Sequence, residues 1–462
     1  MPDRPAPERR RSDAAAAWEL DDAVAIIPSG LPVPIAGTDQ FHEFHAHGEH
    51  YYLSGLYEPT GVLTFDPGDG WTLFAYQPGA VEQVWTGPGI DLDQAREGSA
   101  LDDVRPLTEL SGWLESRRGR RVALLGNPDI TQTPGRYGLS SWSSLELDVD
   151  EQLSRRLSGQ LDVIRRSKDA PELLHMRQAA FASHEGHMVG LNVARAGMTE
   201  RELQVEIEAE FFRAGAERTA YGSIVGGGPN SATLHFAPTR RAFQDGDLIL
   251  VDAGAEVAGY ASDITRTYPV AAKFTGVQRD LYDLVLDVQT AAITAAGPGV
   301  EYKQLHMEAS ERMASGLAYL GILRGEGASL VEQDAQALFF PHGLGHMLGL
   351  ATHDVGGCLA GRVPSDRPTL QYLRADLPLQ PGYVVTIEPG VYFIRALLED
   401  PAARAKHRDT VNWERVDQLM DFGGIRIEDD VLITETGSEV LSAATPKFIS
   451  EIESIRREAL SR

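Results

Sequence analysis

The sequence contains one cysteine, Cys358, in 462 residues, so a disulfide cannot form within a single chain. A lone thiol suits a reducing compartment. Basic residues are also scarce, because 42 Lys and Arg stand against 67 Asp and Glu, which gives a formal net charge of -25. Nucleic acids and anionic membranes carry charge of the same sign. Neither is therefore expected as a partner.

Long apolar runs are also missing. No stretch approaches the roughly 18 uninterrupted apolar residues of a membrane-spanning helix. The first eleven residues lack the apolar core of a signal peptide. Together with the single cysteine, this predicts a cytoplasmic protein. A chain of 462 residues exceeds the size at which one hydrophobic core stops growing, so two domains are expected.

The sequence pattern changes twice along the chain, which predicts three parts. Residues 1–13, rich in Pro, Arg and Asp, are expected to form a mobile tail. Residues 14–163 alternate short apolar runs with helical segments, which indicates an α/β domain. A polar connector at 162–169 then leads into residues 164–462. There, helices such as 170–193 are followed by strands in each of two halves, which indicates an α+β domain.

The segment 248–267 carries two carboxylates that are predicted to lie together. The apolar run before Asp252 indicates a buried strand, and a turn follows before the chain runs back. If that turn is centred between Val257 and Ala258, Asp252 and Asp263 lie directly opposite each other. Like charges in opposite positions repel, so a bound cation is the economical explanation. The alternative is that both are ordinary turn or surface aspartates.

Three histidines, His342, His346 and His353, fall within one glycine-rich stretch. His342 and His346 have the spacing of a helical zinc motif, but Gly343 and Gly345 disfavour a helix, and the glutamate of that motif is missing. The stretch is therefore predicted to be a loop whose backbone comes close to a ligand. A chance cluster of histidines is the alternative.

Two further acids lie in strand-like surroundings. Glu388 ends a β-rich run before Pro389, and a residue before proline favours extended geometry. In residues 423–433, apolar and polar side chains alternate, which places Arg426 and Glu428 on one face of a strand. An acid in so apolar a run needs a partner. That partner is either Arg426, in an ordinary ion pair, or a metal ion.

Together these residues form one candidate ligand set of four carboxylates and one imidazole: Asp252, Asp263, His346, Glu388 and Glu428. An oxygen-rich set with one nitrogen favours Mn²⁺ or a similar divalent ion over a structural zinc. Four carboxylates are too many for one ion, whereas two ions with bridging carboxylates would neutralise the four charges. A dinuclear metal site is therefore expected.

The motifs and their order resemble the pita-bread metallopeptidases, in particular the prolidase and aminopeptidase P group. The motifs are the segment ending at His235, Asp-Ala-Gly with Asp263, His-Gly-x-Gly-His, Ile-Glu-Pro-Gly and Arg-Ile-Glu-Asp. The resemblance covers residues 165–450 strongly and the preceding domain more weakly, through 53–61 and 84–87. It implies an α/β amino-terminal domain of the aminopeptidase P and prolidase type, followed by an α+β pita-bread catalytic domain.

The same resemblance implies the metal chemistry. Asp252 would chelate one metal, His346 and Glu388 would hold the other, and Asp263 and Glu428 would bridge them. Mn²⁺ is the expected ion, with Co²⁺ or Zn²⁺ as alternatives. The implied reaction is attack of a metal-bridged hydroxide on the carbonyl before proline, with Glu388 as proton acceptor. No ligand is missing, which weighs against a non-catalytic pita-bread binding protein.

Residues around the metals also acquire expected roles from the resemblance. His235 and His353 would contact the substrate and stabilise the intermediate or the leaving nitrogen. The other expected substrate contacts are His342, Tyr392, Arg426 and, from the amino-terminal domain of a neighbouring subunit, Trp85. A homodimer or homotetramer is therefore expected.

Two substrate classes stay open, namely Xaa-Pro dipeptides and longer peptides. Residues 373–382 resemble the prolidase segment whose arginine, here Arg374, grips the free carboxylate of a dipeptide. The long segment 394–422 also resembles bacterial prolidases rather than the shorter loop of aminopeptidase P. An Xaa-Pro dipeptidase is therefore favoured over an Xaa-Pro aminopeptidase. If Arg374 is an ordinary surface charge, this preference loses its main support.

Overall fold

The computed structural model describes residues 6–126 and 148–462. The chain divides into two compact units, unit 1 (residues 1–165) and unit 2 (residues 166–462). The division falls near the end of helix α6 (Glu151–Arg166), close to the boundary predicted after residue 163. The polar connector expected at 162–169 is thus mostly helical. Among the described residues, no helix combines the length and the apolar character that crossing a lipid bilayer requires.

The expected mobile tail differs from the structure. Residues 1–5 lie outside the described residues, but residues 6–13 belong to helix α1 (Ala6–Trp18). Arg11 in this helix is buried, and its guanidinium donates hydrogen bonds to the backbone carbonyls of Leu53 and Ser99. A buried arginine with backbone acceptors holds the helix in place, so the prediction of a tail is wrong for residues 6–13.

Unit 1 is built on a mixed sheet with the strand order β4-β3-β2-β1-β5 among the described residues. Strands β1 to β3 pair antiparallel, and the edge strands β4 and β5 run parallel to their neighbours. The strands are β1 (Ala23–Pro28), β2 (Val62–Asp66), β3 (Gly70–Ala75), β4 (Asp103–Pro106) and β5 (Arg121–Leu124). The other helices are α2 (Gly48–Ser54), α3 (Ala80–Thr86), α4 (Leu92–Ser99), η1 (Leu107–Glu109) and α5 (Leu110–Glu115). This confirms the predicted α/β class.

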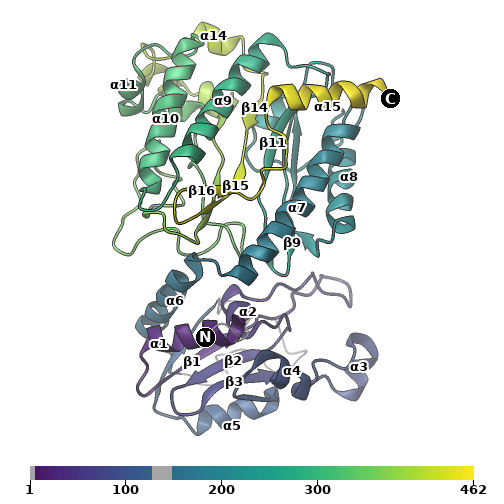
Figure 1. Cartoon of the computed structure of the whole chain (residues 1–462), viewed down its shortest axis with the longest axis vertical. Helices are drawn as coiled ribbons and strands as arrows, with labels where there is room; N and C mark the ends of the chain where they lie inside the picture. Colours follow the sequence, from purple (N-terminus) through teal and green to yellow (C-terminus); the bar gives the residue numbers. More distant parts are fainter. Residues whose placement is uncertain (1–5, 127–147) are drawn as a thin grey trace. The chain divides into compact units, whose positions relative to one another are not determined.

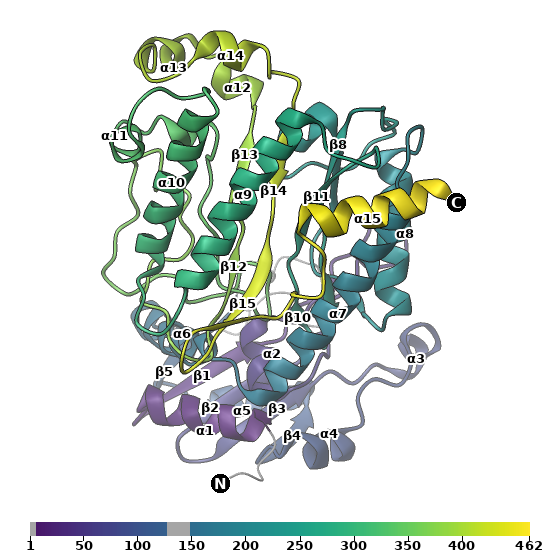
Figure 2. The same cartoon turned by 45° about the horizontal axis from the view of Figure 1, so that its top comes forward.

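Unit 2 contains helices and strands in two successive halves, as predicted. Helices α7 (Ala170–Val193) and α8 (Glu200–Arg213) lie along one side, α9 (Gly276–Ala295) and α10 (Tyr302–Tyr319) lie along the other, and strands run between them (Figures 1 and 2). Asp169 and Thr199 begin α7 and α8, each with a capping box that satisfies the first backbone N–H groups. Local sequence signals therefore determine where these two helices begin.

The strands of the first half are β6 (Arg218–Thr219), β7 (Ile224–Gly227), β8 (Leu248–Asp252), β9 (Ala255–Val257), β10 (Tyr260–Ala261) and β11 (Thr265–Pro269), with η4 (Gly228–Ala232) after β7. Those of the second half are β12 (Val384–Ile387), β13 (Gly390–Tyr392), β14 (Gly424–Arg426), β15 (Asp429–Ile433) and β16 (Ser438–Val440). Short helices of the second half are α11 (Gly327–Glu332), η5 (Gln336–Leu338), α12 (Arg395–Leu398), α13 (Pro401–Lys406) and α14 (Trp413–Asp417), and α15 (Ile449–Ser461) ends the chain.

The hairpin that carries Asp252 has a different register from the predicted one. Asp252 pairs with Thr265, so the turn is centred between Ala258 and Gly259. Both turn residues have positive φ, 50° and 76°, which is the geometry of a type I′ turn and matches the twist of a two-residue hairpin. The prediction that Asp252 and Asp263 lie directly opposite is therefore wrong. Because the partner moves by two residues, Asp263 stays on the same face.

Candidate active site

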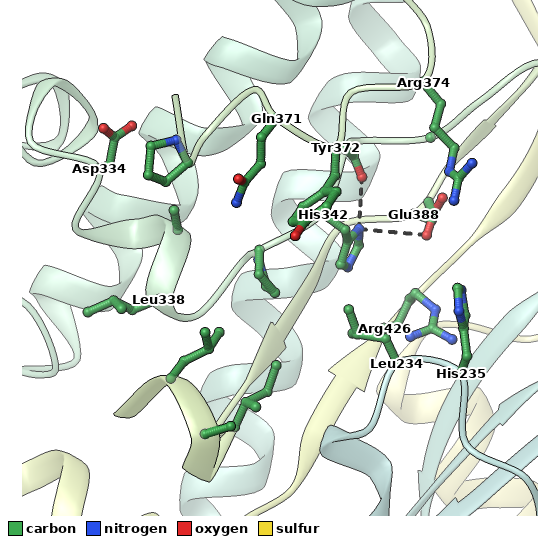
Figure 3. Close-up of a pocket in the computed structure, with 18 of the residues that line it drawn as sticks. Leu234, His235, Asp334, Leu338, His342, Gln371, Tyr372, Arg374, Glu388 and Arg426 are labelled. Atoms are coloured by element: carbon green, nitrogen blue, oxygen red, sulfur yellow. Dashed lines mark hydrogen bonds and ion pairs between the residues drawn. The ribbon is translucent and has the colours of Figure 1, made fainter. Parts of the chain in front are cut away.

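A cavity of about 850 Å³ lies in unit 2, and Figure 3 shows residues that line it. Ten of the residues predicted as site residues line this cavity: His235, Asp252, Asp263, His342, His346, His353, Arg374, Glu388, Arg426 and Glu428. Tyr392 is not in the lining, but it contacts both His342 and Arg426. Trp85 belongs to unit 1 and does not line this cavity. The structure therefore brings together the predicted ligands from segments far apart in the sequence.

The four carboxylates of this site stand where strands end. Asp252 is the last residue of β8, Asp263 lies between β10 and β11, and Glu388 directly follows β12. Glu428 lies in a break between β14 and β15, so the single strand expected over 425–433 is in fact two. A break in a strand frees the local backbone from the regular ladder and re-aims a side chain. Here it places Glu428 in the cavity.

Asp263, His346 and Glu428 form a compact cluster of donor atoms. One ligand atom from each lies within 4.8 Å of the others, and all three residues are buried. His346 Nδ1 donates to the carbonyl of Met347 at 3.0 Å, which turns Nε2 toward the carboxylates. Nε2 lies 3.4 Å from Asp263 Oδ2 and 3.7 Å from Glu388 Oε1. A backbone acceptor behind the ring is the usual support of a metal-binding imidazole.

Asp252 is held by a tyrosine and an arginine. Its Oδ2 accepts a hydrogen bond from Arg426 at 2.5 Å, and its Oδ1 lies 2.6 Å from the Tyr221 hydroxyl. The same hydroxyl lies 2.6 Å from Asp263 Oδ1, so Tyr221 links the two aspartates. Burial, followed by these two carboxylates, raises the pKa of Tyr221 and keeps it a hydrogen-bond donor. No sequence motif marks Tyr221, which is not among the predicted site residues.

Arg426 does not form the direct ion pair with Glu428 that was weighed as an alternative. Its Nε donates to Thr265 Oγ1 at 3.1 Å, and the Thr265 hydroxyl donates to Glu428 Oε2 at 2.6 Å. The guanidinium also donates to the Tyr392 hydroxyl at 2.8 Å. Thr265 was missed as a site residue, although it lies two positions after Asp263 on the same face of the hairpin. Arg426 therefore holds Asp252 directly and Glu428 through the hydroxyl of Thr265.

The cationic side chains of the site do not fully neutralise its buried carboxylates, and the pKa values show this. Burial, and then the neighbouring carboxylates, raise the pKa of Glu428, and burial raises the pKa of Glu388 to about 7. Burial also raises the pKa of Asp252, with Asp263 adding to it. For Asp263 burial acts in the same direction, but the hydrogen bond and charge of His346, together with Tyr221 and Arg426, outweigh it and lower the pKa of Asp263. Such a site favours bound protons or cations, so these residues fit divalent metal ions.

Three further histidines line the same cavity as the candidate ligands. His353 is exposed, and its ring centroid lies 4.4 Å from that of His346. Burial, and then the charge of His346, lower the pKa of His353 to about 4, while burial, and then Arg426, lower the pKa of His342 to about 3. Both rings are therefore neutral at pH 7 and offer one donor and one acceptor. His235 lines the same cavity (Figure 3).

The cavity extends beyond the charged cluster. Arg374 points toward Glu388 at one end, whereas Asp334 and Leu338 lie at the other (Figure 3). Apolar side chains from η5, α12 and α13 also line the cavity, among them Leu338, Leu397, Ala402 and Ala403, together with Ile394 directly before α12. The segment 394–422 therefore supplies one wall of the cavity.

Family models match both units. The model described as metallopeptidase family M24 matches residues 174–435, and the model of the aminopeptidase P N-terminal domain matches residues 8–123. The chain is similar to the Xaa-Pro dipeptidase of Homo sapiens, with 33% identity over 440 residues, 93% of this chain and 88% of the relative. It is also similar to a probable Xaa-Pro aminopeptidase of Fusarium vanettenii, with 34% identity over 427 residues, 91% of this chain and 88% of that one.

Solved structures give the same result. Aminopeptidase P of Escherichia coli with the inhibitor Pro-Leu superposes with a TM-score of 0.81 at 31% identity, over 99% of both chains. This agreement extends over both units, so it concerns the α/β amino-terminal unit as well as the α+β unit that carries the cavity.

Proposed function

Since this chain belongs to metallopeptidase family M24, we propose that it is an Xaa-Pro dipeptidase. It is a peptidase with the pita-bread catalytic domain of that family, preceded by an aminopeptidase P type domain. Its relatives include both Xaa-Pro dipeptidases and Xaa-Pro aminopeptidases at similar identity. The choice between these two substrate classes therefore depends on residues of the cavity.

Arg374 is the observation that supports the dipeptidase. Its side chain lines the cavity and points toward the ligand Glu388, close enough to add to the charges that lower the pKa of His353. A guanidinium forms two parallel hydrogen bonds with a carboxylate. In an Xaa-Pro dipeptide the free carboxylate belongs to the proline itself, next to the bond that is cleaved. We propose that Arg374 binds that carboxylate.

The proposed metal ligands determine the reaction that the site would catalyse. Asp252, Asp263, His346, Glu388 and Glu428 would hold two divalent ions, which supply an activated water and polarise the carbonyl before proline. We propose Mn²⁺, because the donors are mainly carboxylate oxygens.

The neighbouring side chains then move protons and hold the substrate. Glu388 accepts the proton released by the attacking water, because its carboxylate faces the cavity beside His346. The imidazoles of His235 and His353 donate to the developing oxyanion and to the leaving nitrogen. His342 stays fixed between Glu388 and Tyr392.

An Xaa-Pro aminopeptidase is the second candidate, and the size of the cavity favours it. Cavities of roughly 300 to 1,000 Å³ hold drug-sized ligands, which are larger than a dipeptide. This cavity, of about 850 Å³, continues from the charged cluster to α13. A longer peptide therefore has room to continue beyond proline.

A comparison of two substrates tests the proposal. With Mn²⁺-loaded protein, we expect kcat/KM for Ala-Pro to exceed that for Ala-Pro-Ala, because only the dipeptide places its carboxylate within reach of Arg374. Ala-Ala serves as the control for the requirement for proline. The released amino acids are measured by chromatography. Preferential cleavage of Ala-Pro-Ala would contradict the dipeptidase and favour the aminopeptidase.

We also propose that the enzyme is a homodimer or larger, in which Trp85 of one subunit approaches the substrate of another. Trp85 is 72% exposed, and Val81 and Val84 on the same short helix, α3, are also exposed. Such a group of apolar side chains on one helix is typical of an interface. Sedimentation at micromolar concentration is expected to give at least twice the 50.3 kDa of one chain. A fully active 50.3 kDa species would contradict this oligomeric state.

The cytoplasmic location stays a prediction.

A further inference from the structure

We infer that Lys168 is a positioning residue for His353 and acts through a buried ion pair with Asp354. Asp354 directly follows His353, and Lys168 lies just before α7. Lys168 Nζ is 3.1 Å from Asp354 Oδ2, and each side chain is only 1% exposed. The inference rests on the proposed role of His353 in the hydrolysis of Xaa-Pro substrates.

The loop that carries His353 folds back on itself. The backbone N–H of Asp354 donates to the carbonyl of Met347 at 3.0 Å, and that of Gly349 donates to the carbonyl of Ala351 at 3.2 Å. His353 itself is exposed at the edge of the cavity, so its own contacts fix it weakly. The position of its imidazole beside His346 therefore depends on the loop behind it.

The buried ion pair joins this loop to the residue before α7. Two buried charges neutralise each other, and breaking such a pair by removing one member is strongly unfavourable. The pair also packs directly on the backbone of Gly349. A methyl group at this glycine would lie 2.2 Å from Asp354 Oδ2 and 2.7 Å from Lys168 Cε. Without Lys168, Asp354 would lose this contact, and the loop would lose its link to the residue before α7.

The neighbours of Lys168 hold the adjoining backbone. Arg166 donates from Nε to the carbonyl of Gly356 at 2.7 Å and from Nη2 to the carbonyl of Cys358 at 3.0 Å. The N–H of Lys168 donates to the carbonyl of Gly382 at 2.8 Å, in the turn before β12. Residues 166–168 are thus tied to the segment after His353 and to the turn before β12, the strand that Glu388 directly follows. Lys168 lies within this fixed support.

A double-mutant cycle tests the inference with the metal-loaded full chain and Ala-Pro as substrate. Lys168→Met is expected to lower kcat by about 10- to 100-fold, a part of the roughly 100- to 10,000-fold that a positioned proton donor contributes, with KM and metal content unchanged. In the His353→Ala background, the same substitution should cause no further loss, because residues that act through one another are not additive. A purely structural role would instead make the two losses multiply, which would overturn the inference.

Two further variants serve as a control and as a replacement in the double-mutant cycle. Arg241→Met removes another ion pair of unit 2, Arg241 with Asp247 at 2.8 Å, which does not line the cavity, so kcat should stay unchanged. Gly349→Ala replaces Lys168→Met in the cycle if the latter does not yield folded protein, because it displaces the same ion pair. If the wild-type protein cleaves no Xaa-Pro substrate, the proposed function fails, and the wild-type measurement reveals this separately.

Discussion

Asp263→Asn and Glu428→Gln are each expected to abolish hydrolysis of Ala-Pro while leaving the fold intact. Both residues lie in the compact cluster with His346, and we propose that both bridge the two metals. An amide oxygen carries no charge, so either substitution removes a negative ligand that no neighbouring side chain replaces. Metal ions contribute several kcal/mol of transition-state stabilisation, which corresponds to roughly a thousandfold or more in kcat.

Metal content and folding must be measured together with turnover. The substitutions remove repulsion between buried carboxylates, because Asp263 is among the groups that raise the pKa of Glu428. The metal-free variants should therefore unfold at a temperature no lower than metal-free wild type. Asp287→Asn, which alters an exposed carboxylate of α9, is the matched control and should stay fully active. A variant with both metals bound and kcat within about tenfold of wild type would contradict the bridging assignment.

Local signals were sufficient to predict some elements of the fold. Helix α7 begins and ends where its amphipathic pattern predicted, and α8 follows the capping box of Thr199. Pro389 marks the end of β12, because the residue before proline favours extended geometry. These features depend on residues that are close together in the sequence, so the sequence alone can reveal them.

Other elements depended on contacts that the local sequence does not show. Ala258 adopts positive φ without being a glycine, and this moved the turn by one residue from its predicted place. The tail expected at residues 6–13 is helical because Arg11 finds backbone acceptors far away in the chain, at Leu53 and Ser99. Composition alone cannot predict such acceptors. A polar segment was therefore read as mobile although it packs as a helix.

The candidate site also contains residues that the sequence could predict and residues that it could not. The carboxylates and histidines could be predicted, because charged residues inside apolar runs are costly unless they have partners. The partners themselves could not be predicted. Tyr221 lies 31 residues from Asp252 in sequence, and Arg426 lies 174 residues from it, yet both hydrogen-bond to it. These pairings arise from tertiary packing. Lys168, paired with Asp354, belongs to the same class of residue.

Arg374→Ala is expected to weaken hydrolysis of Ala-Pro far more than hydrolysis of Ala-Pro-Ala. If the guanidinium binds the carboxylate of proline, its removal should cost about 1.5 to 3 kcal/mol of transition-state stabilisation, the range for a hydrogen bond to a charged group. This corresponds to roughly a ten- to 150-fold loss in kcat/KM. A tripeptide carries its carboxylate one residue further from the cleaved bond, so its kcat/KM should change much less.

Two controls separate recognition of the carboxylate from a general loss of charge. Arg374→Lys keeps the positive charge but lacks the planar fork, so it should recover only part of the activity on Ala-Pro. Arg312→Ala removes an arginine of α10 that pairs with Asp287 and does not line the cavity, and it should affect neither substrate. If Arg374→Ala lowers kcat/KM equally for both peptides, the arginine is structural. The cavity that extends to α13 would then favour the aminopeptidase.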